Sequence, residues 1–383
     1  MDPALGLVLT GGGARAAYQV GALRALAEQT CACCPFGVIA GASAGAINGT
    51  AIAGTADDFA GGAARLEATW RAIAPDSIYA TDVPRLAEIG ADWLRQLAGG
   101  GHLGGHANAL LDTAPLRALL GDALPLARIP ELIAAGHLRG VAVTATSYDT
   151  GAAVTFFDGV PELEPWQRTG RIARRATLTV DHVLASAAIP VFFPPIHVDG
   201  APYADGCVRL TAPLSPAIRM GAQRIIGIGI HEVTPPTVPV PADPPHSPTP
   251  AEIAGVLLDA VFLDSLEADA ERLIRINTTL AAMTPAQRRT LSLRPIPLLV
   301  LQPSLDLGRL AVEQYHQMPW ALRYLLAGIG ADGQRGWDLL SYLAFVPVYI
   351  DRLIDLGYRD TTARRDEIAR FLDGDAAPAA RAG

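Results

Sequence analysis

The pentapeptide Gly41-Ala42-Ser43-Ala44-Gly45 stands directly after the apolar residues 38–40 and before a run of small residues. This order predicts a strand, a sharp turn and a helix, the geometry that lifts a serine hydroxyl above a sheet. The flanking residues must be small because strand and helix come close together at such a turn. The helix N-terminus would direct its partial positive charge at the serine. Ser43 is therefore the candidate nucleophile, and Gly41 and Gly45 are the candidate elbow glycines.

A second glycine-rich turn precedes this elbow. Leu5 to Thr10 has the pattern of a buried strand, Gly11-Gly12-Gly13 forms a turn, and residues 15–29 have helical apolar spacing. Further strands are predicted at 139–146, 154–157 and 224–230. Strands that alternate with helices indicate a parallel sheet with helices on both faces, so we expect a three-layer α/β/α protein.

The turn Gly11-Gly12-Gly13 has two interpretations. It resembles the start of a dinucleotide fingerprint, but Ala16 occupies the third glycine position and no acidic residue ends a second strand where one is expected. Alternatively, the N–H groups of Gly12 and Gly13 form an oxyanion hole for acyl transfer. The serine elbow on the next strand favours the oxyanion hole. Arg15 would then brace the loop, unless it is an ordinary surface arginine.

Asp205 is the candidate general base. Asp before Gly is often only a turn former, as in Ala204-Asp205-Gly206-Cys207. A carboxylate that accepts a hydrogen bond from Ser43 could instead take its proton, provided that its pKa lies near neutrality. Three histidines follow Ser43 and leave a conventional triad open: His197, His231 and His316.

Composition excludes several classes of protein. The net charge of −8 argues against a nucleic-acid partner. The chain contains no lysine, which rules out a Walker lysine, a Schiff base and a Ser-Lys dyad. We see no secretory signal, and we interpret the uncharged stretch 30–56 as buried strand, turn and helix because it is built mainly from small residues. These features predict a cytoplasmic protein that has no transmembrane helix.

The cysteine pattern does not predict a metal site. Cys31, Cys33 and Cys34 are clustered, but no histidine lies near them in sequence, so we interpret them as reduced or incidental thiols. No feature of the sequence calls for a cofactor or a metal.

The rest of the chain divides by composition. We expect a catalytic domain over 1–233 with a helical insertion at about 57–124, a proline-rich linker at 234–250, a helical region at 251–372 and a disordered tail at 373–383. Residues 251–280 are expected to form one long helix. The glycine-rich segment Gly99 to His106 is either a lid or a solvated connection.

Four ordered segments resemble the motifs of the patatin-like phospholipase family. Gly11 to Arg15 is similar to its oxyanion motif, Gly41 to Gly45 to its nucleophile motif, and Asp205-Gly206 to its aspartate motif. The block 185–195 is similar to its small-residue and proline segment, to which we assign a structural role. The resemblance extends from Leu5 to about Ile230. Two departures are Ala16, where the family usually has Gly, and Cys207, where it usually has Gly or Ala.

The resemblance implies a serine acyl hydrolase that cleaves phospholipids or related esters with a Ser43–Asp205 dyad, an oxyanion hole at Gly11, Gly12, Gly13 and Arg15, and no cofactor. The C-terminal aromatic helices could contact a membrane, or could pack in the core or in a dimer interface; the oligomeric state is not predicted. A catalytically silent lipid-binding or assembly module, or a dinucleotide-dependent oxidoreductase, is the alternative.

Overall fold

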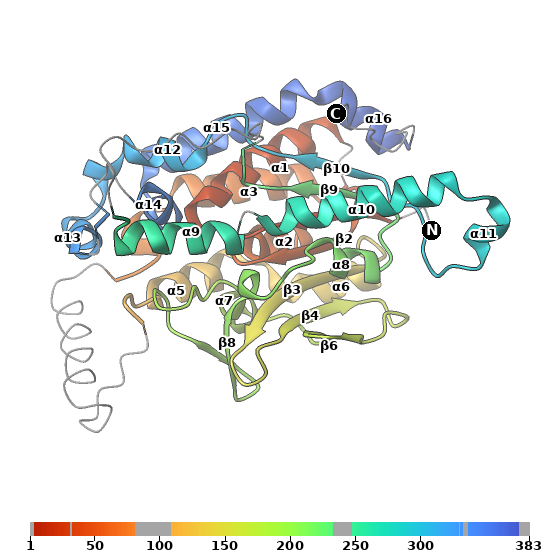
Figure 1. The fold of residues 1–383 in the computed structure, drawn as a ribbon, viewed down its shortest axis with the longest axis horizontal. Helices are drawn as coiled ribbons and strands as arrows, with labels where there is room; N and C mark the ends of the chain where they lie inside the picture. The colour runs from red at the N-terminus through yellow and green to blue at the C-terminus, as the bar shows by residue number, and fades with distance from the viewer. Residues whose placement is uncertain are drawn as a thin grey trace.

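The computed structural model describes residues 4–30, 33–80, 109–232, 247–262, 264–328, 330–331 and 336–374. A central mixed sheet lies between two layers of helices (Figure 1), which confirms the expected three-layer α/β/α class. Its strand order is β10-β9-β1-β2-β3-β4-β6-β5, and the short hairpin β7-β8 joins β3. The strands are β1 (Leu5–Leu9), β2 (Phe36–Ala42), β3 (Gly140–Ser147), β4 (Ala153–Gly159), β5 (Gln167–Arg168), β6 (Arg171–Arg175), β7 (Ile196–Val198), β8 (Ala201–Asp205), β9 (Arg224–Ile228) and β10 (Leu298–Leu301).

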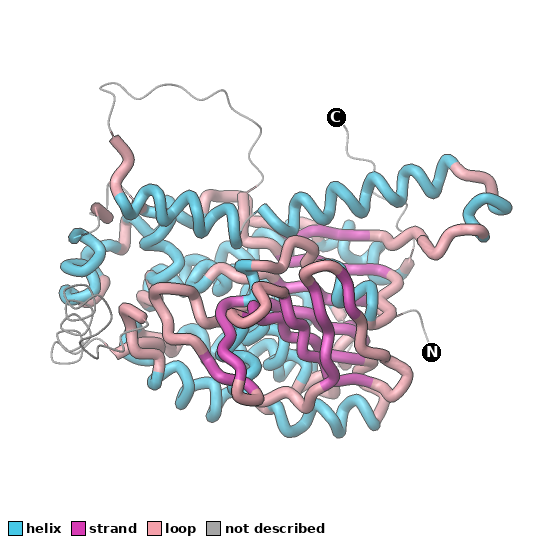
Figure 2. Tube along the Cα trace, turned by 60° about the horizontal axis from the view of Figure 1, so that its bottom comes forward, coloured by secondary structure: helices cyan, strands magenta, loops and turns pink. Residues whose placement is uncertain are grey.

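The five strands from β10 to β3 are parallel, and helices cover both of their faces (Figure 2). Side chains of β1 alternate between two cores: Leu7 and Leu9 belong to one, and Val8 belongs to the other. Continuous apolar strands of this kind are typical of a sheet that is buried on both sides.

The helical layers are unequal. The larger one contains the helices that follow β1 and β2 together with the C-terminal helices, and the smaller one contains α8 and α10. The helices are α1 (Ala17–Gln29), α2 (Ala44–Ala53), α3 (Phe59–Arg71), α5 (Ala114–Ala123), α6 (Ile129–Ala134), α7 (Val180–Ser186), α8 (Leu214–Arg219), α9 (Pro250–Phe262), α10 (Asp264–Ala282), α11 (Pro285–Arg289), α12 (Leu307–Val312), α13 (Trp320–Gly328), α14 (Trp337–Leu343), α15 (Pro347–Ala363) and α16 (Arg365–Asp373). Short 3₁₀ helices are η1 (Gly13–Ala16), η2 (Pro75–Ser77), η3 (Leu126–Arg128), η4 (Gly206–Val208) and η5 (Tyr315–Gln317).

The C-terminal region is packed closely onto the N-terminal half. Helix α15 lies against α1, where a Cβ atom on Gly21 would be 1.8 Å from the carbonyl oxygen of Ile354 and one on Gly357 would be 2.0 Å from that of Tyr18. These two glycines allow the helix backbones to approach each other. Strand β10, in the region expected to be helical, extends the sheet beside β9.

Several expected segments differ in detail or lie outside the description. The long helix expected at 251–280 is two helices, α9 and α10, and Asp373, expected in the tail, is the last residue of α16. The candidate lid at 99–106, most of the linker (234–246) and the residues from 375 onward lie outside the described residues. In the described part of the chain, no helix is long and apolar enough to cross a membrane.

Candidate active site

Two strands meet end to end along β3 and bring the candidate nucleophile and base together. Strand β2 runs parallel to β3 and ends with Ala42 opposite Thr144. Strand β8 runs antiparallel to β3 and ends with Asp205 opposite Ala145. Because Thr144 and Ala145 are adjacent, the residue that follows β2, Ser43, lies beside the last residue of β8.

Ser43 has the backbone conformation of a nucleophile elbow. Its φ of 55° and ψ of −131° lie in a region that non-glycine residues rarely occupy. A Cβ atom on Gly45 would be 2.3 Å from the Leu9 carbonyl oxygen, and one on Gly41 would be 2.3 Å from the Gly45 carbonyl oxygen. Both elbow glycines are therefore required by the close packing of β1, β2 and α2.

A second serine holds the elbow in place. The Ser43 N–H donates to Ser186 Oγ at 2.9 Å, and the Ser186 hydroxyl donates to the Thr144 carbonyl at 2.5 Å. Ser186 is completely buried at the end of α7. The block 185–195 was expected to have only a structural role, and its one serine is the signal in the sequence for this specific contact.

Asp205 is fully buried, and one of its two carboxylate oxygens has a hydrogen-bond partner. Its Oδ1 accepts a hydrogen bond from the Cys207 N–H at 2.9 Å, and its carbonyl accepts one from Thr146 Oγ1 at 2.8 Å. Oδ2 has no hydrogen-bond partner of good geometry among the described residues. Burial raises the pKa of this carboxyl to about 7, although the neighbouring Ser43 hydroxyl and the Cys207 N–H lower it. Ser43 and Asp205 are thus neighbours whose hydrogen bond is not fully formed, as is common in unliganded catalytic sites.

The glycine turn lies against the elbow. A Cβ atom on Gly11 would be 2.6 Å from Ser43 Cβ and 2.5 Å from Cys207 Sγ. Gly12 and Gly13 have φ values of 154° and 54°, which favour glycine. Gly13 also approaches the backbone of α14, because a Cβ atom there would be 2.2 Å from the Tyr342 carbonyl oxygen.

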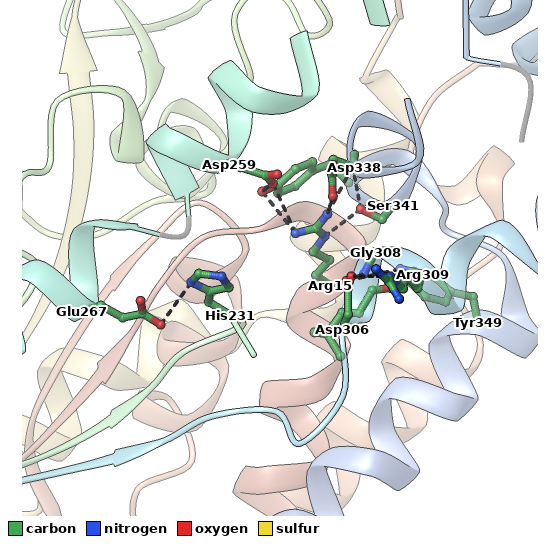
Figure 3. Close-up of polar contacts among 12 residues, drawn as sticks. Arg15, His231, Asp259, Glu267, Asp306, Gly308, Arg309, Asp338, Ser341 and Tyr349 are labelled. Carbon is green, nitrogen blue, oxygen red and sulfur yellow. Dashed lines mark hydrogen bonds and ion pairs between the residues drawn. The ribbon is translucent and has the colours of Figure 1, made fainter. Parts of the chain in front are cut away.

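The Arg15 side chain extends from the glycine loop towards the C-terminal helices (Figure 3). Its Nε donates to Ser341 Oγ at 2.6 Å and an Nη atom donates to Asp338 Oδ1 at 3.1 Å, both on α14. It also pairs with Asp259 of α9 at 3.4 Å, and its guanidinium lies 4.3 Å from the centre of the Tyr342 ring. Arg15 is only 3% exposed, so it is not a surface arginine. It connects the glycine loop to α9 and α14.

Cys207 places a thiol in the site. It is buried beside Gly11 and Asp205, and burial raises its pKa well above the usual value, with Asp205 adding to the rise. The thiol is therefore neutral near neutral pH. Cys33 and Cys34 carry no disulfide, and Cys31 lies outside the described residues. Among the described residues, no cluster of His, Cys, Asp and Glu could hold a metal ion.

The histidines considered for a triad occupy other positions. His231 follows β9, and its Nδ1 lies 3.1 Å from Glu267 Oε1 on α10 (Figure 3). His197 is an exposed residue of β7, and His316 lies in η5. The carboxylate of Asp205, by contrast, lies next to Ser43.

A cavity of about 530 Å³ leads away from Ser43 between α2, α3 and α5, and we name it the α2–α3–α5 channel. Its volume falls within the range of small-molecule sites, roughly 300–1,000 Å³. Ser43 and Gly13 lie at one end, and charged residues lie at the other. Apolar side chains line most of the length between them: Ala44, Ile47, Ala51, Leu66, Trp70, Ile73, Ile78, Leu116, Leu119, Leu120, Leu124, Ile189, Phe193 and Phe345.

A family model agrees with the sequence resemblance. The model of the family described as patatin-like phospholipase matches residues 7–218. The fold is similar to VipD from Legionella pneumophila, with 13% identity, a TM-score of 0.36 and coverage of 96% of this chain and 67% of that chain. It is also similar to human GIVD cytosolic phospholipase A2 in complex with methyl gamma-linolenyl fluorophosphonate, with 16% identity, a TM-score of 0.42 and coverage of 97% of this chain and 58% of that chain. No curated protein matches the chain at a significant level.

Proposed function

Because the chain belongs to the patatin-like phospholipase family, whose model matches more than half of its length, we propose that it hydrolyses acyl esters of phospholipids or related lipids through a Ser43–Asp205 dyad. Family membership supports lipid acyl hydrolysis in general. The observation that carries the specific proposal is the meeting of β2 and β8 along β3, which buries an elbow serine beside a carboxylate with a free oxygen.

Acylation begins when Asp205 Oδ2 takes the proton of Ser43 Oγ and the serine oxygen forms a bond to the ester carbonyl carbon. A pKa near 7 leaves about half of the Asp205 carboxyl groups ionised at neutral pH and makes the protonated form a competent acid. The proton then passes from Asp205 to the oxygen of the departing alcohol as the tetrahedral intermediate collapses. Ser43 is left as an acyl ester.

The oxyanion of each tetrahedral intermediate would be held by the N–H groups of Gly12 and Gly13, next to the positive end of α2. Arg15 supports this loop from behind through α9 and α14 rather than by touching substrate. In deacylation, Asp205 removes a proton from water, and the water oxygen attacks the acyl carbon. As this tetrahedral intermediate collapses, the bond to Ser43 Oγ breaks, Asp205 returns the proton to that oxygen, and the fatty acid is released.

We also propose peripheral contact with lipid. Trp320 and Tyr324 on α13 are 60% and 79% exposed, whereas Tyr342 and Tyr349 are fully buried. Exposed aromatic side chains of this kind suit the interface between water and lipid. Co-sedimentation with phosphatidylcholine vesicles should weaken when Trp320 and Tyr324 are both replaced by Ser; unchanged sedimentation would contradict this contact.

The test of the function is fatty-acid release from phosphatidylcholine and from p-nitrophenyl esters. Ser43→Ala and Asp205→Asn should each lower kcat by at least roughly a thousandfold. Asp199→Asn is the matched control, because Asp199 is exposed in the β7–β8 turn and should tolerate the change. If a folded wild type hydrolyses no ester but binds lipid equally well with and without Ser43→Ala, the silent binding module is the better account.

A further inference from the structure

One face of α2 forms a wall of the α2–α3–α5 channel. Ala44, Ile47 and Ala51 line it, and their spacing of three or four residues places them on one side of the helix; Thr55, in the turn that follows α2, continues the same wall. The interval from Ala44 to Thr55, which comprises α2 and the turn after it, corresponds to roughly 16 Å at a helical rise per residue. The channel therefore starts beside Ser43 and follows α2 for its full length.

The far end of the channel is charged and exposed to solvent. Arg128 pairs with Asp57 at 2.6 Å, and Arg65 pairs with Asp58 at 3.3 Å. The side chains of Arg65 and Asp58 are 58% and 55% exposed. An alkyl group would lose water along the apolar wall but would meet solvent and ion pairs at this end, so burial of further methylene groups stops there.

The position of the base decides which part of an ester occupies the channel. Asp205 must reach the oxygen of the departing alcohol in order to protonate it. Neither Asp205 nor Cys207 lines the channel, whereas Ser43 and Gly13 do. The alcohol therefore lies on the Asp205 side of Ser43, and the acyl chain lies in the channel.

We propose that the α2–α3–α5 channel binds the acyl chain of the substrate and holds about its first 12 carbons. The length follows from roughly 16 Å of channel wall, formed by α2 and the turn after it, and about 1.3 Å per carbon of an extended chain, given C–C bonds of about 1.5 Å. The inference rests on the proposed function, because it assigns the acyl group of that reaction to this cavity.

The first test is kcat/KM for p-nitrophenyl esters from acetate to palmitate, each below its micelle concentration. The value should rise by up to about fourfold per methylene as far as laurate and stay level beyond it. Acetate esters of alcohols from ethanol to dodecanol should show no such rise. A flat acyl series, or a rise that continues unchanged to palmitate, would overturn the inference while leaving the hydrolase intact.

Two variants locate the chain within the channel. Ala51→Leu, about 10 Å from Ala44 along the helix, should move the plateau to roughly eight carbons. Ala123→Leu, on the partly exposed end of α5, should shorten the plateau by fewer carbons and carries less risk of misfolding. Ala68→Leu is the matched control, because Ala68 is exposed on α3 and does not line the channel. The same plateau in all variants would contradict the assignment.

Binding separates this inference from the reaction. Ser43→Ala should bind fatty acids with an affinity that increases from hexanoate to laurate and then levels off. If no ester is hydrolysed but this binding series is found, the proposed function fails and the channel assignment stands. If esters are hydrolysed but fatty-acid affinity does not depend on chain length, the channel assignment fails alone.

Discussion

The pKa of Asp205 makes activity and stability depend on pH in opposite directions. Burial raises that pKa to about 7 in the folded protein, against about 3.9 for an exposed aspartate. The base form should therefore be about 9% populated one pH unit below 7 and about 90% populated one unit above it. We expect kcat/KM for a p-nitrophenyl ester to fall roughly tenfold per pH unit below about pH 7 and to level off above it.

The stability effect follows from proton linkage. Because the folded pKa is raised, the native state binds the Asp205 proton more tightly than the unfolded chain between about pH 4 and pH 7. The difference in Asp205 ionisation between the unfolded and folded states then lowers the free energy of unfolding by roughly 2 kcal/mol at pH 5 and by about 4 kcal/mol at pH 8, relative to a protein in which Asp205 stays protonated. The stability that the protonated Asp205 carboxyl contributes is fully present below its unfolded-state pKa of about 4, and it is lost as the pH rises through its folded-state pKa of about 7.

Asp205→Asn removes this dependence. Its amide oxygen can still accept the Cys207 N–H, and it cannot ionise. Urea unfolding at pH 5 and pH 8 should show that the variant gains roughly 2–3 kcal/mol relative to wild type between the two conditions, with Asp199→Asn as the control. A pH–rate profile that is flat down to pH 5, together with an Asp205→Asn variant that gains nothing at pH 8, would refute a raised pKa at Asp205.

Three further changes test the supports of the site. Arg15→Met should lower the free energy of unfolding, measured in urea, by on the order of 3 kcal/mol. This is the low end of the cost of breaking a buried ion pair, because the acidic partners of Arg15 are partly exposed. A loss below 1 kcal/mol would contradict the anchoring role. Ser186→Ala leaves the Ser43 N–H without its acceptor and should cost about 1–3 kcal/mol, with kcat reduced and KM little changed in ester kinetics; an unchanged kcat would count against positioning. Gly45→Ala should lower the free energy of unfolding by at least roughly 1–3 kcal/mol in thermal unfolding, because the added Cβ would overlap the backbone of β1. In the control Gly121→Ala, the added Cβ meets no atom within 4 Å, so that variant should be neutral or slightly stabilised. Equal stability of the two variants would contradict the packing argument.

The elbow could be predicted from sequence because its requirements are local. A strand, a serine between small residues and a helix lie within about twenty residues. The close approach at Gly41 lies inside that unit, and the one at Gly45 is to the end of β1. The glycine turn on the preceding strand is equally local. Parallel pairing of β1 and β2 then brings the turn and the elbow to the same edge of the sheet.

Contacts between distant segments carry no comparable local signal. The sequence did not predict β8, the five-residue strand whose antiparallel pairing with β3 brings Asp205 to Ser43. Nor did it show that Arg15 would bind Ser341, 326 positions away, because that contact depends on how α14 packs against the glycine loop. The boundary between α9 and α10 was missed because apolar residues continue at helical spacing from Phe262 to Leu266.

The most direct test of the dyad is reaction with a fluorophosphonate, followed by intact-protein and peptide mass spectrometry. The wild type should form one adduct on Ser43, and Asp205→Asn should form it far more slowly, while Asp199→Asn should match the wild type. Absence of the Ser43 adduct from folded protein would contradict the serine hydrolase. An adduct that forms at the same rate in Asp205→Asn would contradict the role of Asp205 as the base.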